Sequence, residues 1–92
     1  MSTYVMFGKY SQGSIKEISA ERTQKTNQLI SDNAGSVKSG YALLGDTDLV
    51  LVVDFPSNDD AMKASVGLTK LLGIAFTTAP AVSLEEFDKL VG

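Results

Sequence analysis

Residues 49–55, LVLVVDF, form the stretch of this sequence that decides the fold. The first five of them are aliphatic without a break, which is typical of a strand buried on both faces. One of these faces can meet helices of the same chain. The other face needs a separate cover.

Turn-forming residues flank this strand on each side. Before it, residues 45–48, GDTD, predict a hairpin that connects it to a weaker strand over residues 37–44, VKSGYALL. After it, Ser57 can cap a helix over about residues 59–72. Gly73 is the expected end of that helix, because glycine readily adopts the left-handed conformation.

The N-terminal part of the chain predicts another strand and another helix. Residues 3–9, TYVMFGK, are rich in aromatic and β-branched side chains and are followed by a loop. Ser14 and Glu17 have the spacing of a capping box, which indicates a helix over about residues 15–33. Gly35 is expected to close that helix in the left-handed conformation.

The C-terminal part predicts a fourth strand and a tail helix. The strand covers residues 74–79, IAFTTA, with Pro80 at its end or at a sheet edge, because proline has no N–H to donate. Ser83 and Glu86 form a further capping box at the start of a short helix. Its large apolar residues share one side: Leu84, Phe87 and Val91.

This order of elements, strand-helix-strand twice, predicts an α+β fold of the ferredoxin-like βαββαβ type. We expect a four-stranded antiparallel sheet with two helices on one face and a short C-terminal helix, in a single domain over residues 1–92. The uncovered sheet face would carry alternate residues of 4–7 and 49–53, an apolar patch too large for a monomer to expose. We therefore expect a homodimer that forms through the sheet faces.

The composition excludes several classes of site and partner. The chain has no cysteine and no histidine, which removes disulfides, thiolate nucleophiles, the commonest metal ligand and the usual general base near neutral pH. The formal net charge is −3 with no basic cluster, so we expect no nucleic-acid partner. No segment approaches the ~20 apolar residues of a membrane span, and no cationic leader is present. We expect a cytoplasmic protein with no membrane contact, no cofactor and no metal ion.

The first predicted helix has a polar interruption on its apolar side. Its stripe begins and ends with apolar residues but has Arg22, Lys25 and Thr26 in the middle. Either the helix is loosely docked there, or a polar cavity lies beneath it. Arg22 could then bind a carboxylate or phosphate through two parallel hydrogen bonds. In the simpler interpretation, its stem packs while the guanidinium reaches water or a local acid.

Aromatic and acidic residues give further candidates. Tyr4 and Tyr41, with Phe7, could line a ligand pocket between helix and sheet, although core packing is the simpler role. Asp46 and Asp48 flank one hairpin residue, where two carboxylates can share a proton, hold a cation or simply stabilise the turn. The candidate ligand-binding residues are Arg22, Tyr41, Asp48 and Tyr4.

The sequence also resembles a known family. Residues 4–9, the following loop that ends in Gly13, Arg22 in the first helix, and residues 45–50, GDTDLV, resemble the GYD-domain proteins, members of the dimeric α+β barrel superfamily. Gly45 and Asp48 match two members of the Gly-x-Tyr-Asp pattern, whereas Thr47 stands where the family has tyrosine. The resemblance covers nearly the whole chain and implies the same fold and a dimer through the sheets. It implies no single activity, because the superfamily includes cofactor-free oxygenases, haem-handling enzymes, isomerases and ligand-sensing modules.

No constellation of residues specifies a reaction, and two main functional hypotheses follow. In the first, a dimeric barrel protein binds a small, partly apolar or anionic ligand between the sheet and the first helix, near Arg22 and Tyr41. In the second, a cofactor-independent oxygenase or isomerase acts on a hydrophobic substrate in the barrel, with Asp48, Tyr41 or Arg22 in polar roles. A purely structural module, with a solid interior, is the remaining alternative.

Overall fold

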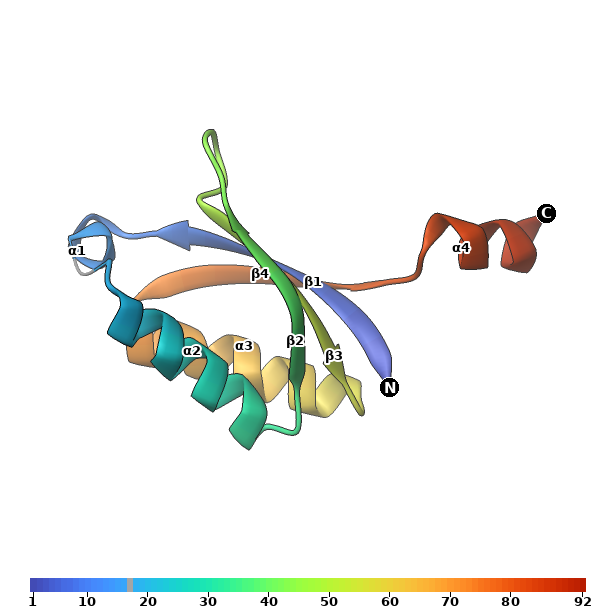
Figure 1. Ribbon diagram of the computed structural model, residues 1–92, viewed down its shortest axis with the longest axis horizontal. Coiled ribbons are helices and arrows are strands. Elements are labelled where there is room, and N and C mark those ends of the chain that lie inside the picture. Colours follow the sequence, from blue (N-terminus) through green and yellow to red (C-terminus); the bar gives the residue numbers. More distant parts are fainter. Residues whose placement is uncertain (17) are drawn as a thin grey trace.

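One antiparallel sheet with the strand order β2-β3-β1-β4 organises the molecule (Figure 1). The computed structural model describes residues 1–16 and 18–92 of the chain. The elements in chain order are β1 (Ser2–Tyr10), α1 (Gln12–Ile15), α2 (Ala20–Asp32), β2 (Ser36–Ala42), β3 (Leu49–Phe55), α3 (Asn58–Leu72), β4 (Ile74–Ala81) and α4 (Leu84–Val91). The helices α2 and α3 lie together on one side of the sheet (Figure 1). The expected ferredoxin-like fold, with a short C-terminal helix, is therefore confirmed.

Alternating side chains of the two central strands build the core. On β1, Tyr4 and Met6 point toward the helices and are buried, and on β3 Leu51, Val53 and Phe55 do the same. Helix α3 completes the core with four buried residues, which are Ala61, Ala64, Leu68 and Leu72. The small residues at its start let this helix lie close to the sheet.

The second face of β3 has only a partial cover. Val50 and Val52 point away from the helices and are half-buried, and Phe7 beside them on β1 is 42% exposed. We call the side of the sheet opposite the helices the open face. We expected both faces of β3 to be buried. Within a single chain, only the face toward the helices is buried.

Helix α2 begins later than the sequence predicted. Ser19 has extended backbone angles, φ −162° and ψ 161°, and its Oγ accepts a hydrogen bond from the Arg22 backbone N–H at 3.1 Å. Ser19, not Ser14, is therefore the N-cap, and Ser14 lies within the separate short helix α1. The prediction of one continuous helix over residues 15–33 was wrong. Glu17, the other half of the predicted capping box, lies outside the described residues.

Different residues adopt the left-handed conformation at the C-terminal ends of α2 and α3. Gly73 ends α3 in the left-handed conformation, φ 68°, as predicted. After α2, Ala34 takes that conformation instead, at φ 63°. At Gly35 there is no room for a side chain, because a Cβ there would lie 2.5 Å from the Phe55 ring and 2.6 Å from the Ile30 side chain. Glycine allows this connection to pack directly on the core.

A β-bulge in β2 controls which way its side chains point. Val37 pairs with Val53, but the next pair is Ser39 with Val52, so Lys38 is an extra residue. Beyond the bulge, Tyr41 pairs with Val50 and therefore lies on the open face.

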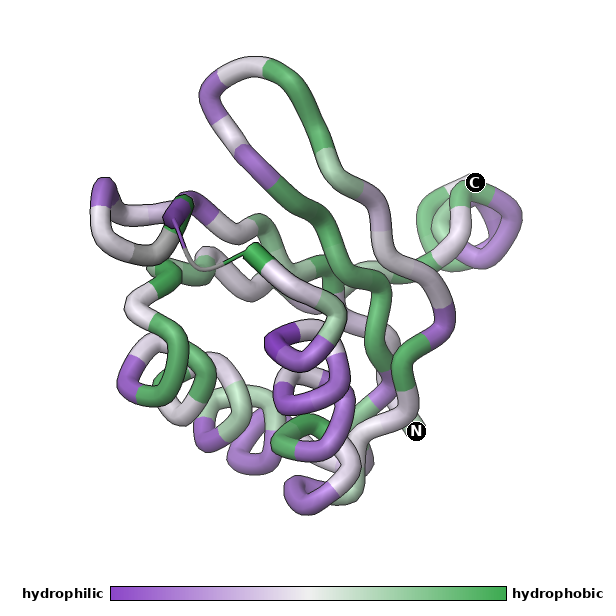
Figure 2. The backbone as a smooth tube through the Cα atoms, turned by 60° about the vertical axis from the view of Figure 1, so that its left-hand side comes forward, coloured by the Kyte–Doolittle hydropathy of each residue, from purple (hydrophilic) through white to green (hydrophobic). Residues whose placement is uncertain are grey.

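Helix α4 and the β2–β3 loop both project from the body of the molecule (Figures 1 and 2). All eight residues of α4 are exposed. Ser83 caps it as predicted, because its Oγ accepts a hydrogen bond from the Glu86 backbone N–H at 3.1 Å. The helix is thus well formed but contributes nothing to the core of its own chain.

None of the helices in the described part of the chain combines the length and the apolar character needed to cross a membrane.

Candidate ligand-binding site

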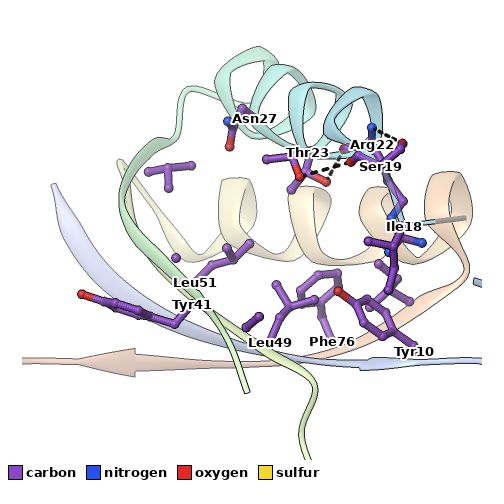
Figure 3. A pocket seen from close by; sticks show the side chains of 15 residues that line it. Tyr10, Ile18, Ser19, Arg22, Thr23, Asn27, Tyr41, Leu49, Leu51 and Phe76 are labelled. Carbon is purple, nitrogen blue, oxygen red and sulfur yellow. Dashed lines mark hydrogen bonds between the residues drawn. The ribbon is translucent and has the colours of Figure 1, made fainter. Parts of the chain in front are cut away.

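A cavity of about 390 Å³ lies between α2 and the sheet. Figure 3 shows it with α2 above and the strands below. Its lining residues come from the segment before α2, from α2 itself and from all four strands: Tyr10, Ile18, Ser19, Arg22, Thr23, Thr26, Asn27, Val37, Gly40, Tyr41, Ala42, Leu49, Leu51, Ile74 and Phe76. The structure therefore contains a hollow beneath the polar interruption of this helix.

The sheet side of the cavity is apolar. Leu49, Leu51, Ile74 and Phe76 provide its floor. Gly8 lies beneath two of them, and a Cβ there would come within 2.9 Å of both Leu49 and Phe76. Because glycine occupies this place, the two large side chains can pack side by side over β1.

The helix side of the cavity is polar. Thr23, Thr26 and Asn27 belong to the face of α2 that lines it, and Figure 3 shows the labelled Thr23 and Asn27 on the helix above the cavity. The hydroxyl of Thr26 donates to the Arg22 carbonyl oxygen at 2.9 Å. Its oxygen can still accept a hydrogen bond from a ligand.

Arg22 and Tyr10 form one wall together. The Arg22 guanidinium lies 4.9 Å from the centre of the Tyr10 ring, in a cation–π arrangement (Figure 3). The Tyr10 backbone N–H donates to the Asp48 carboxylate at 2.8 Å. Asp48 thereby fixes the end of β1, and the Tyr10 ring on that segment supports the guanidinium.

The four residues predicted for the site lie in different parts of the structure. Arg22 lines the cavity, and Asp48 stands behind its wall as the partner of Tyr10. Tyr41 borders the cavity on β2, but the residue is 64% exposed and its ring points away from the cavity in Figure 3. The bulge before it accounts for this orientation.

Tyr4 belongs to the core and not to the cavity. It is 4% exposed, and its ring meets Phe55 edge to face with 5.8 Å between ring centres. Its hydroxyl donates to the Asn58 side-chain oxygen at the start of α3. The simpler of the two roles weighed for Tyr4, core packing, is the one that it has.

Several lining residues were missed by the sequence interpretation. Tyr10 was assigned to a loop, and Thr23 and Asn27 were not singled out. The polar stripe of α2 was a usable signal for Thr23 and Asn27. Tyr10 had no such signal, because its position depends on the hydrogen bond to Asp48, which is distant in sequence.

One carboxyl group on the open face has a perturbed pKa. The Thr3 hydroxyl donates to Asp54 at 2.7 Å, and Lys38 lies 3.2 Å from the same carboxylate. The hydrogen bond from Thr3, followed by the contact with Lys38, holds the pKa of Asp54 below its ordinary value of 3.8. This group does not line the cavity, and its contacts join the central strand β3 to β1 and β2.

Across residues 1–16 and 18–92, no three carboxylates are grouped so that they could hold a metal ion. The cavity instead offers a guanidinium, hydroxyls and an amide over an aliphatic and aromatic floor. Such a set can orient and retain an amphipathic molecule. Among the lining residues that the structure describes, no nucleophile is paired with a base.

Comparisons with known proteins agree on the fold. A family model described as GYD domain matches residues 4–91. A solved structure of the leucine response regulatory protein of Mycobacterium tuberculosis is similar, with a TM-score of 0.59 and 8% identity, over 89% of this chain and 51% of that one. A homoserine dehydrogenase from Thiobacillus denitrificans also has a TM-score of 0.59, with 12% identity, over 90% of this chain and 18% of the enzyme. The chain thus spans about half of the first protein and under a fifth of the second. A sequence comparison with curated proteins gave no match.

Proposed function

The chain belongs to the GYD-domain family, and from this membership and the cavity we propose that it is a homodimeric binding protein for a small amphipathic carboxylate. The main observation behind this proposal is that the cavity is apolar on its sheet side and polar on its helix side, where Arg22 lies. A guanidinium matches the planar geometry of a carboxylate and can bind it with two parallel hydrogen bonds. The aliphatic or aromatic part of the ligand would lie on Leu49, Leu51 and Phe76.

The size of the cavity sets the size of the ligand. Its volume, about 390 Å³, is near the lower end of the range for small-molecule sites, roughly 300–1,000 Å³. A medium-chain fatty acid or an aromatic acid with one or two rings suits such a space. We choose octanoate as the probe, because octanol has the same chain length without the charge.

The open face of the sheet supports the proposed homodimer. Val5, Phe7, Val50 and Val52 lie together there, with Tyr41 at the β2 edge. A contiguous apolar surface on a small domain marks an interaction site. A two-fold pairing through this face covers the same patch on both copies at once.

The oxygenase or isomerase hypothesis receives less support. Its three polar residues do not converge, because Arg22 is on the helix side of the sheet and Tyr41 is on the open face. Asp48 is engaged with the Tyr10 backbone. Within a single chain, these three side chains are therefore not all directed into the cavity.

Calorimetric titration with octanoate and octanol tests the ligand proposal. We expect octanoate to bind more tightly than octanol, and Ala42→Phe to weaken both, because Ala42 lines the cavity on the helix side of β2. Ala20→Phe is the matched control, since Ala20 is exposed at the start of α2 and outside the lining. Equal affinity for acid and alcohol, or no effect of Ala42→Phe, would refute the proposal.

A further inference from the structure

We propose that α4 of one copy packs against the β2–β3 loop, residues 43–48, of a second copy. The inference builds on the homodimer proposed above and adds the element that joins the two chains. Both segments carry exposed apolar side chains, and both stand away from the body of their own chain (Figures 1 and 2).

Helix α4 has an apolar stripe without a partner in its own chain. Its large apolar residues and their exposed fractions are Leu84 81%, Phe87 49%, Leu90 67% and Val91 66%. On the opposite side, Lys89 and Glu85 form an exposed ion pair at 3.8 Å. The helix is therefore amphipathic, and its apolar side requires a second surface.

The β2–β3 loop offers a matching surface. Leu44 is fully exposed at 104%, and Leu43 beside it is 39% exposed. The Leu43 backbone N–H donates to the Asp48 carbonyl at 2.8 Å, so the loop is closed by its backbone and does not need the leucine side chains for its shape. Turn positions normally carry polar residues, so the two adjacent exposed leucines give this loop an apolar surface that another molecule can cover.

The two segments leave the sheet at opposite ends. Ala81, the last residue of β4, pairs with Thr3 at the start of β1. Leu49, the first residue after the loop, pairs with Gly8 near the end of β1. Because β4 and β2 are also the two edge strands, the segments lie at diagonally opposite corners of the sheet. A two-fold axis that lies between the two open faces, perpendicular to the line from α4 to the loop, brings each α4 to the loop of the other copy.

Within one chain the same contact is out of reach. The five steps from Thr3 to Gly8 and two more to Leu44 span about 23 Å along the sheet. The three steps from Ala81 to Leu84 extend at most about 11 Å, and the centre of the stripe at Phe87 lies only about 5 Å farther along the helix. A second copy is therefore the occupant that the geometry allows.

Acidic residues border both surfaces of the proposed contact, so added salt should strengthen it. Glu86 and Asp88 flank the stripe on α4, and Asp46 is exposed in the loop. These groups repel one another across the contact, and added salt screens the repulsion.

Directed thiol exchange tests the contact, because the natural chain has no cysteine. One batch carries Leu90→Cys, converted by Ellman's reagent to its mixed disulfide with thionitrobenzoate. A second batch carries Leu44→Cys as the free thiol. Attack by the free thiolate joins the two chains and releases the coloured leaving group. Val66→Cys is the matched control, because Val66 is 55% exposed on the outer side of α3. Sedimentation of the unmodified protein reports separately whether the dimer exists.

We expect the Leu44→Cys copy to react at least tenfold faster than the Val66→Cys copy, and to react faster still in added salt. Equal rates for the two positions in a protein that sediments as a dimer would overturn the α4 contact alone. Sedimentation as a monomer of 9.8 kDa would overturn the homodimer and this contact together.

Discussion

Replacing Arg22 with methionine isolates the contribution of its charge to ligand binding. Methionine keeps an unbranched stem of similar reach but removes the guanidinium that lines the cavity. A hydrogen bond to a charged group contributes about 1.5–3 kcal/mol, and the half-buried position of Arg22 reduces this to about 1–2 kcal/mol. The affinity for octanoate should therefore fall by about 5- to 30-fold.

Calorimetric titration of octanoate and octanol into each variant measures this loss. Octanol affinity should change little, because the alcohol has no charge for Arg22 to bind. Lys25→Met is the control, since it removes a positive charge from the same helix at an exposed position outside the cavity. An equal loss of octanoate affinity in both variants would show that general electrostatic attraction, and not the Arg22 contact, holds the ligand.

Three further predictions concern stability. Asp48→Ala should lower the free energy of unfolding by about 1–2 kcal/mol in urea denaturation, because the Tyr10 backbone N–H loses its acceptor; an unchanged midpoint would contradict this. Tyr4→Phe should cost about 1 kcal/mol in the same assay through the lost hydroxyl bond, and a change in octanoate affinity would argue against a pure core role. Because the folded-state pKa of Asp54 is lowered, its stabilisation is complete above pH 3.8 and disappears as the pH falls through the lowered value. Asp54→Asn should thus destabilise the protein near neutral pH and have no effect in strong acid, and a deficit independent of pH would contradict the assignment.

Local patterns in the sequence were sufficient for most of the fold. The unbroken aliphatic run gave β3 its observed bounds, Leu49–Phe55, and the caps at Ser57 and Ser83 were correct. These features depend on neighbours a few residues away. The start of α2 was misplaced because two serines can cap a helix there, and the extended backbone at Ser19 decides between them.

The orientation of Tyr41 shows what a local pattern cannot predict. Strict alternation of β2 from Val37 would place Tyr41 opposite Leu49, on the helix side of the sheet. The bulge at Lys38 shifts the register by one residue and moves the ring to the open face. Gly40, where a Cβ would come within 2.9 Å of Leu51, was the only local hint of this irregularity.

The sequence indicated where a cavity could lie, but not which contacts form its wall. The polar middle of the helix left two possibilities, a loosely docked helix or a cavity beneath it, and the structure has a cavity there. The cation–π contact with Tyr10 and the bond from Tyr10 to Asp48 join residues that are far apart in sequence. The pairing of β1 with β3 brings Tyr10 to Asp48, and the position of α2 beside the sheet brings Arg22 to Tyr10.

Native mass spectrometry of the protein with octanoate tests the central claim most directly, because one spectrum reports subunit number and bound ligand together. We predict a dimer of twice 9.8 kDa that retains one octanoate per chain and retains less of it in the Arg22→Met variant. A protein that retains no octanoate when the acid is in excess would contradict the account of the cavity.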